Sequence, residues 1–228
     1  MVDVWVLFQF YREFGAGYMR KEDESIAVVI LAAGEARRFG SPKQLAVWNG
    51  LPLLQVPINL VRELGFKPWV ALGAHRTEIL GCADLNFEGC QIIEVNDWAI
   101  GLSVSIKASL KALQKQNEDV KGVIFLLADQ PLLSTTDLEK LLQVIRESSG
   151  QIICSEYLLK GLPSVGVPAY FPQKYFDELM LLSGDKGAKK VIMGNQHTII
   201  SMNKHLCDID TPEDLLLLAS LIVQKCAD

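Results

Sequence analysis

A loop of small and basic residues follows the first strongly apolar segment of the chain. That segment ends in Ala33 and Gly34, and the loop after it carries Arg38 and Lys43. Small residues let a ligand approach the backbone, whose amide and carbonyl groups can bind a base or a ribose. Arginine offers a phosphate a planar pair of donors, and lysine offers a point charge. The loop therefore suggests a nucleoside polyphosphate, although an ordinary strand-to-helix connection with solvated basic residues would look the same.

A carboxylate follows a second apolar run. The run GVIFLLA is followed directly by Asp129, and Gln130 and Pro131 come next. A charge at the end of a buried strand needs a partner or a metal ion. Mg²⁺ prefers oxygen ligands and is commonly held by one or two carboxylates together with substrate phosphates. We expect Asp129 to bind Mg²⁺; the alternative is a carboxylate that only caps a turn.

The acidic string DIDTPED near the end of the chain has two components. Thr211, Pro212 and Asp214 fit the N-cap, first and third positions of a helix with a capping box. Asp208 and Asp210 fall outside that explanation. Alternation along an extended segment places both on one face, so either could reach a metal held by Asp129.

Short apolar runs alternate with helical patterns along the chain. The expected strands are Ile26–Ala32, Trp69–Gly73, Gln91–Val95, Gly122–Leu127, Gln151–Ser155 and Thr198–Met202. The expected helices are Leu51–Leu64, Ser103–Lys115, Thr135–Glu147, Pro172–Leu182 and Pro212–Lys225. The alternation predicts a Rossmann-like, three-layer α/β/α fold with a mainly parallel sheet. Ligands of such sheets bind beyond the carboxyl ends of the strands, where the basic loop and Asp129 are both expected.

Composition narrows the classes of function. The chain has 228 residues, a formal net charge of −5 and 50% hydrophobic residues, which is enough for a buried core. No global charge favours nucleic acid or a membrane surface as a partner, and no apolar run reaches the roughly 18 residues of a membrane span. The five cysteines are odd in number and lack metal-ligand spacing, so we expect reduced thiols in a cytoplasmic protein.

One domain is expected over residues 25–228, preceded by an extension of uncertain role over residues 1–24. The extension is either an additional terminal element or the product of a start assigned upstream of Met19.

Taken in order, the motifs resemble the MobA-like nucleotidyltransferases, and within them the molybdenum cofactor cytidylyltransferase branch. The resemblance runs from about Ile26 to Leu217. It rests on LAAG with the basic loop, the segment Asn96–Ser105, DQP, the segment Gly161–Pro168, GD-x-GA at 184–188 and DIDTPEDL at 208–215. It implies the nucleotide-diphospho-sugar transferase type of fold and Mg²⁺-dependent transfer of a nucleoside monophosphate to a phosphorylated acceptor, with pyrophosphate leaving. The implied donor is CTP, the implied acceptor is molybdopterin or its molybdenum form, and a molybdoenzyme or its chaperone is the implied recipient of the product.

The resemblance also assigns residues. Catalytic roles are implied for Arg38, Lys43 and Asp129. Nucleotide binding is implied for Leu31, Ala32, Ala33, Gly34, Arg38, Lys43, Gly73, Asn96, Gly101, Ser103 and Ser105, with Ser103 also expected to cap its helix. Metal binding is implied for Asp129 with Asp208 or Asp210. Acceptor binding is implied for Gly166, Pro168, Gly184, Asp185 and Lys189.

Three positions depart from the family pattern. Ala36 replaces a serine of the loop, Val167 replaces a histidine before Pro168, and Lys189 replaces an arginine. The last two belong to the acceptor half, so other acceptors remain open: a sugar phosphate, methylerythritol phosphate or lactyl phosphate, or molybdopterin with GTP as donor.

Two other classes remain as alternatives, an NAD(P)-binding oxidoreductase and a non-catalytic nucleotide-binding regulator. Against the oxidoreductase, the first turn lacks G-x-G-x-x-G and no acidic ribose ligand follows the second strand.

Overall fold

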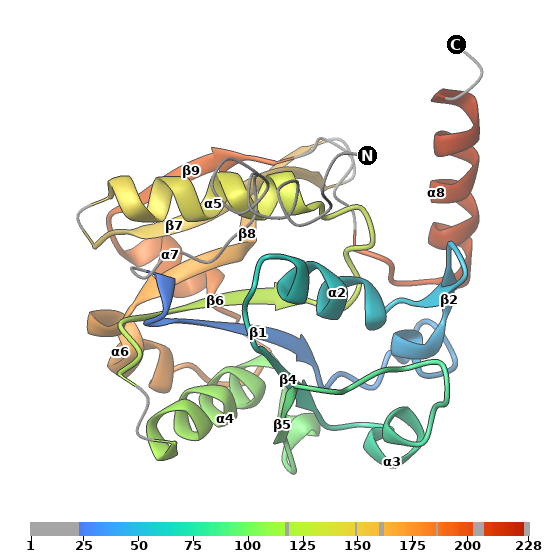
Figure 1. Cartoon of the computed structure of the whole chain (residues 1–228), viewed down its shortest axis with the longest axis horizontal. Coiled ribbons are helices and arrows are strands. Elements are labelled where there is room, and N and C mark those ends of the chain that lie inside the picture. Colours follow the sequence, from blue (N-terminus) through green and yellow to red (C-terminus); the bar gives the residue numbers. More distant parts are fainter. Residues whose placement is uncertain are drawn as a thin grey trace, which may run out of the picture.

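A twisted sheet with helices on both faces forms the body of the protein (Figure 1). The computed structural model describes residues 23–116, 119–148, 150–159, 162–185, 187–202 and 208–225. The main sheet of this part contains β1 (Ile26–Ala32), β4 (Pro68–Leu72), β5 (Gln91–Glu94), β6 (Gly122–Leu127), β7 (Ile152–Leu159), β8 (Leu162–Pro172) and β9 (His197–Ser201). A small hairpin pairs β2 (Val47–Trp48) with β3 (Leu51–Pro52). The α-helices are α2 (Gln55–Glu63), α3 (Arg76–Leu80), α4 (Leu102–Lys115), α5 (Thr135–Glu147), α6 (Phe176–Met180), α7 (Lys189–Gly194) and α8 (Pro212–Lys225).

The strand order is β5-β4-β1-β6-β8-β7-β9. β1 runs parallel to both β4 and β6, β4 runs parallel to β5, and β7 runs parallel to β9. Only β8 reverses direction, because it pairs antiparallel with both β6 and β7. The expected three-layer, mainly parallel architecture is confirmed, and the loops after β1 and β6 leave the sheet side by side.

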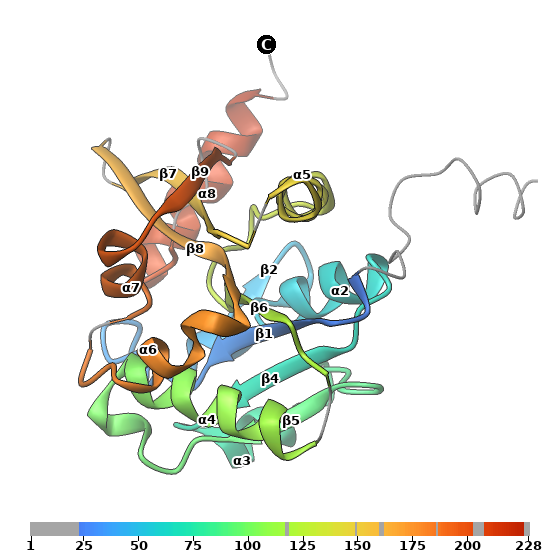
Figure 2. The same ribbon diagram turned by 90° about the vertical axis from the view of Figure 1, so that its left-hand side faces the viewer.

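Alternation along β1 divides the core in two. Val28 and Ile30 pack in one cluster with residues of α2 and α5, whereas Val29 and Leu31 pack in the other with residues of α4 and α6. Figure 2 shows α2 and α5 on one side of the central strands and α4 and α6 on the other. A strand apolar on both faces is what a sheet covered on both sides requires.

Several segments differ from the sequence-based expectation. No strand was expected over residues 162–171, yet they form most of the long strand β8, whose pattern is interrupted by Pro163, Gly166 and Pro168. The helix expected over Pro172–Leu182 is shorter, because Pro172 ends β8, Gln173–Tyr175 form a 3-10 turn and α6 covers only Phe176–Met180. The helix expected over Leu51–Leu64 begins only at Gln55. Before it, β2 and β3 form a hairpin around an Asn-Gly pair, and both residues of that pair have positive φ, a typical tight-hairpin geometry.

The amino-terminal edge of the described chain is fixed by an ion pair. Asp23 is fully buried and accepts hydrogen bonds from Nε and Nη2 of Arg146 at 3.0 and 2.6 Å. Arg146 lies in the last turn of α5, so this bidentate contact ties the approach to β1 to a helix more than a hundred residues later. Residues 1–22, which form most of the expected extension, lie outside the described residues.

Replacing Asp23 with alanine should destabilise the fold, because it leaves the largely buried guanidinium of Arg146 without this carboxylate. We expect the free energy of unfolding to fall by about 3 kcal/mol. Urea denaturation measures the loss, with Asp84→Ala as the control at an exposed position. Equal stability of the two variants would show that the buried pair contributes nothing.

Candidate active site

A cavity of about 510 Å³ opens at the carboxyl ends of β1 and β6. Its walls come from four places: the end of β1 with the basic loop, the end of β6, the start of α4, and the loop regions around Asp185 and Asp210. Among the lining residues are Leu31, Ala32, Ala33, Gly34, Arg38, Lys43, Gln44, Trp98, Gly101, Ser105, Asp129, Asp185 and Asp210. The cavity therefore lies where ligands of parallel α/β sheets bind.

Gln44 fixes the wall formed by the end of β1. Its Nε2 donates to the carbonyl oxygens of Ala32 and Gly34 at 2.8 and 3.0 Å. These two acceptors fix which end of the amide is the nitrogen, because a flipped amide would place oxygen against oxygen. Within the described residues the amide oxygen of Gln44 is buried and has no hydrogen-bond partner.

The centre of the cavity holds alternating charges. Lys43 Nζ lies 2.5 Å from Asp129 Oδ2 and 3.6 Å from Asp210 Oδ1. Arg38 Nη2 lies 2.9 Å from Asp210 Oδ2. The side chains of Lys43 and Asp129 are each only 16% exposed, so water screens this pair weakly. The second oxygen of this carboxylate, Asp129 Oδ1, is buried and has no hydrogen-bond partner in the part of the chain that the structure describes.

Asp208 faces a different neighbour. Gln130 Nε2 donates to Asp208 Oδ1 at 2.9 Å and to the carbonyl oxygen of Val167 at 3.3 Å, which joins the loop after β6 to β8. Burial raises the pKa of Asp208 to about 6, and the negative charge of Asp129 adds to the rise. Tyr157 lies in the same electrostatic neighbourhood, where burial and these two carboxylates raise its pKa to about 12 and keep its hydroxyl neutral.

Backbone contacts bring the late acidic segment to the cavity. The amide of Ile209 donates to the carbonyl oxygen of Asp129 at 2.9 Å. Asp214 Oδ2 accepts from the amides of Asp210 and Thr211 at 2.9 and 2.7 Å, and Thr211 Oγ1 accepts from the amide of Asp214. The expected capping box at the start of α8 is thus present, and it fixes the backbone of Asp210.

The start of α4 corrects one expectation. Gly101, with φ of 124°, is the N-cap residue, and Ser103 lies inside the helix. Among the residues that the structure describes, the hydroxyl of Ser103 is buried without a hydrogen-bond partner and does not cap the helix, while its amide donates to the carbonyl oxygen of Gly184. A Cβ on Gly101 would lie 2.6 Å from the carbonyl carbon of Gly184. Glycine is therefore required at position 101 by both its φ angle and the close approach of this loop.

The structure brings together most, but not all, of the residues predicted from sequence. Eight of the predicted nucleotide-binding residues line the cavity: Leu31, Ala32, Ala33, Gly34, Arg38, Lys43, Gly101 and Ser105. Gly73 and Asn96 line a neighbouring cavity on the other side of Trp98. Of the predicted acceptor residues, Asp185 lines the main cavity, whereas Gly166, Pro168, Gly184 and Lys189 do not.

The three predicted metal ligands do not converge on one point. Among the described residues, no group of three histidine, cysteine or acidic side chains is arranged to hold a metal ion. Asp129 and Asp210 meet at the ammonium of Lys43, while Asp208 is turned toward Gln130. The alternation argument placed Asp208 and Asp210 on one face; the structure gives them different neighbours.

Sequence reasoning missed Gln44, Gln130 and Tyr157 as parts of the site. Glutamine and tyrosine carry no motif signal here, and their roles depend on contacts between distant segments. The only available signal was position, because Gln44 and Gln130 each directly follow a charged residue that was identified.

The raised pKa of Asp208 predicts a pH-dependent stability. The folded protein keeps this proton up to about pH 6, whereas the ordinary value is 3.8. Because the folded state binds the extra proton, this group makes metal-free protein less stable as pH rises from about 4 to about 7. Asp208→Asn keeps an acceptor for Gln130 and carries no charge, so it should raise the free energy of unfolding at pH 7.5 by about 2 kcal/mol.

Urea denaturation in chelator between pH 4.5 and 7.5 measures the difference between variant and wild type, with Asp84→Asn as the control. A difference that does not grow with pH would contradict the raised pKa.

Comparison with curated proteins finds relatives of low identity. The purine catabolism protein PucB of Bacillus subtilis (strain 168) is 28% identical over 202 residues, which cover 82% of this chain and 92% of that protein. The molybdenum cofactor guanylyltransferase of Xanthomonas euvesicatoria pv. vesicatoria (strain 85-10) is 30% identical over 114 residues, covering 50% of this chain and 52% of that protein.

Solved structures share the architecture. Rv0371c of Mycobacterium tuberculosis H37Rv, solved in complex with manganese, is 25% identical, with a TM-score of 0.70 over 86% of this chain and 98% of that one. Solved nucleotidyltransferases of lower identity share the same fold, the nucleotide-diphospho-sugar transferase fold. The MobA-like NTP transferase domain matches residues 28–199, most of the described body and the greater part of the cavity wall. The chain therefore belongs to the MobA-like NTP transferase family and is a nucleotidyltransferase.

Proposed function

We propose that this protein transfers CMP from CTP to the phosphate of molybdopterin or its molybdenum form, with Mg²⁺ bound and pyrophosphate released. The observation that carries the proposal is one cavity in which Arg38 and Lys43 lie beside the carboxylates of Asp129 and Asp210, next to the small residues at the end of β1. Such a site suits a nucleoside triphosphate, because cationic side chains can bind the phosphates, carboxylates can bind the metal ion, and small residues leave room for the base.

Arg38 and Lys43 are the proposed ligands of the triphosphate. Both now contact carboxylates in the cavity, Lys43 with Asp129 and Arg38 with Asp210. A polyphosphate is the stronger anionic partner for them, because it offers several charged oxygens in the same space. The backbone of the small residues Ala32, Ala33 and Gly34, held by the side chain of Gln44, would bind the base and ribose.

Asp129 and Asp210 fit the role of Mg²⁺ ligands. Both carboxylates lie near one cation, the ammonium of Lys43, and a buried oxygen of Asp129 has no partner among the described residues. Oxygen ligands from two carboxylates, completed by substrate phosphates, are a common magnesium environment. The ion would neutralise charge on the phosphates during transfer. Asp208 would act indirectly, by holding Gln130 and the loop of Asp129.

The reaction requires positioning more than covalent chemistry. An oxygen of the acceptor phosphate attacks the α-phosphorus of the nucleotide, the new P–O bond forms, and the bond to the β-phosphate oxygen breaks so that pyrophosphate leaves. Arg38 and Lys43 stabilise the charge that moves onto the leaving group. The acceptor phosphate is itself an adequate nucleophile, so no serine or cysteine nucleophile is needed.

The acceptor is proposed to enter between two elements: the loop that contains Gly184 and Asp185, and strand β8. Asp185 lines the cavity, and Lys189 Nζ lies 3.3 Å from Ser164 Oγ on β8. Gly166 and Pro168 lie farther along the same strand. Lys189 is the proposed cationic contact of the acceptor.

The proposal also includes a molybdoenzyme or its chaperone as the recipient of the product, and a cytoplasmic location. Within the described residues no helix is long and apolar enough to cross a membrane.

Pyrophosphate release from each of the four NTPs tests the proposal. The protein is incubated with Mg²⁺ and, in separate reactions, with molybdopterin, methylerythritol phosphate, a sugar phosphate and lactyl phosphate. We expect release above background with CTP and molybdopterin. Release with GTP, or with another acceptor, would correct the specificity while keeping the reaction. No release from any NTP, together with tight NADH binding, would contradict transferase activity.

Arg38→Ala should chiefly weaken the use of the nucleotide, because one of two proposed phosphate contacts is lost. We expect kcat/KM for the NTP to fall by about 100-fold, corresponding to about 3 kcal/mol. Steady-state kinetics at varied NTP concentration measures the change.

Lys67→Ala removes one positive charge at an exposed position before β4 and serves as the matched control. An Arg38→Ala enzyme with the same NTP dependence as this control would rule out the phosphate contact.

A further inference from the structure

The main cavity has two chemically different ends, one on each side of β1. Asp129 directly follows β6, so the ion pair of Lys43 and Asp129 marks the end of the cavity beside that strand. Trp98 lies against Gly73, the residue that follows β4, and marks the opposite end. β4 and β6 flank β1 on opposite sides (Figure 1). A nucleotide whose phosphates bind at the charged end therefore directs its base toward Trp98.

Trp98 approaches the end of β1 closely. A Cβ on Gly73 would lie 2.6 Å from Trp98 Cβ and 2.9 Å from the carbonyl oxygen of Ala33, so a larger residue would force one of them to move. The amide of Ala74 donates to the same carbonyl oxygen at 3.0 Å, which ties the end of β4 to the end of β1. Only the backbone of a glycine therefore separates Trp98 from the wall of small residues.

Trp98 is also the one aromatic residue that lines the main cavity in the part of the chain that the structure describes. Its side chain is half-buried and packs against the core cluster that includes Ile106 of α4. A short 3-10 turn, Trp98–Ile100, carries it, and the amides of Ile100 and Gly101 close this turn on the carbonyl oxygens of Asp97 and Trp98. An indole positioned in this way loses little conformational entropy when a ligand binds.

A nucleobase is the part of a ligand that fits this wall. Aromatic side chains stack on the flat face of any base, because every base has a π face. Backbone amide and carbonyl groups can bind the edge of the same base, and the residues at the end of β1 supply them beside Trp98.

A second cavity, of about 450 Å³, lies on the other side of Trp98. It is lined by the ion pair of Arg76 and Glu94, whose Nη1 and Oε1 are 3.1 Å apart. Lys43 and the backbone at the end of β1 line the main cavity and do not line this one. The base is therefore assigned to the face of Trp98 that looks into the main cavity.

We infer that Trp98 is the stacking platform for the base of the nucleotide, with the edge of the base against the backbone at the end of β1 and the phosphates at Lys43. The inference rests on the proposed nucleotide site and adds the contact that holds the base. Because stacking accepts any base, Trp98 contributes affinity, and the choice among NTPs falls to the backbone groups that meet the edge of the base.

Isothermal titration calorimetry with Mg²⁺ and without acceptor tests the inference. Each of the four NTPs is titrated, and the one that binds most tightly is compared with inorganic tripolyphosphate, which keeps the phosphates and lacks the base. Trp98→Ala should raise the Kd of the NTP about 30-fold and leave the Kd of tripolyphosphate within about twofold of the wild type. Trp98→Phe keeps an aromatic face and should recover most of the NTP affinity.

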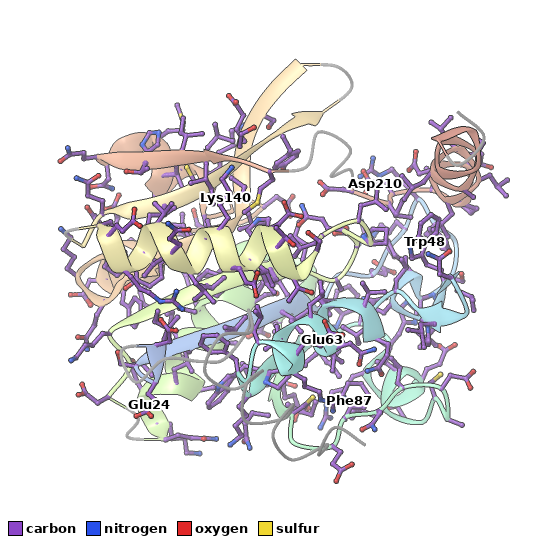
Figure 3. All side chains as sticks on the ribbon, turned by 45° about the horizontal axis from the view of Figure 1, so that its top comes forward. Glu24, Trp48, Glu63, Phe87, Lys140 and Asp210 are labelled. Atoms are coloured by element: carbon purple, nitrogen blue, oxygen red, sulfur yellow. The ribbon has the colours of Figure 1, made fainter. Side chains whose placement is uncertain are left out.

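Tryptophan fluorescence gives a second readout. The NTP should quench the emission of the wild type and of Trp48→Phe, whereas tripolyphosphate should not. Trp98→Phe should lose this quenching. Trp48 is the matched control because it is buried with Leu53 and Leu218 and does not line the cavity; Figure 3 shows it beside α8. Circular dichroism checks that the variants are folded.

The outcomes separate a base contact from a structural role. Equal weakening of NTP and tripolyphosphate binding by Trp98→Ala would overturn the inference, as would an unchanged NTP affinity. If Trp98→Ala does not fold, Trp98→Phe decides, because quenching that persists in this variant would also overturn the inference. A wild-type protein that binds no NTP would contradict the nucleotide site itself, whereas NTP binding that ignores Trp98 contradicts only the stacking.

Discussion

The ammonium of Lys43 between the carboxylates of Asp129 and Asp210 is the contact on which the site depends. It joins three segments that are far apart in the sequence: the loop after β1, the loop after β6, and the residue that precedes the first turn of α8. Three charges packed into a partly buried space are stable only while each has an opposite neighbour. When a nucleotide and a metal ion bind, the phosphates can replace the carboxylates as partners of Lys43, and the metal ion can replace Lys43 as the partner of the carboxylates. No charge is left without an opposite neighbour at either stage.

The sheet makes this contact possible. Because β1 and β6 are adjacent and parallel, their carboxyl ends deliver the basic loop and Asp129 to the same edge. The amide of Ile209 then binds the backbone beside Asp129, and the capping box of α8 holds Asp210.

Much of this arrangement could be predicted from the sequence. β1, β6, α5 and α8 have the expected bounds, because each is a long, strongly patterned segment with clear end signals such as the capping boxes at Ser134 and Thr211. The positions of Arg38, Lys43 and Asp129 could also be predicted, because parallel α/β sheets bind ligands beyond the carboxyl ends of their strands and all three residues follow such strands. Strand β8 could not be read in this way, because its prolines and glycine interrupt the alternation on which strand prediction relies.

The finer parts of the site depend on tertiary contacts. Sequence alternation made Asp208 and Asp210 equivalent candidates. In the structure Asp208 accepts a hydrogen bond from Gln130, whereas Asp210 forms an ion pair with Arg38. Ser103 fitted a cap by type, but Gly101 alone tolerates the approach of the Gly184 loop. Such distinctions are decided by which segments pack together, and a single sequence does not contain that information locally.

Pyrophosphate release by Asp129→Ala, with CTP, molybdopterin and Mg²⁺, tests the central claim most directly. We expect a loss of at least about 1000-fold, because the variant removes a carboxylate that faces both the metal and Lys43. The exposed control Asp84→Ala should retain wild-type turnover, and the circular dichroism of both variants should match that of the wild type. A folded Asp129→Ala protein that turns over at the wild-type rate, or that no longer needs a divalent metal, would contradict the account.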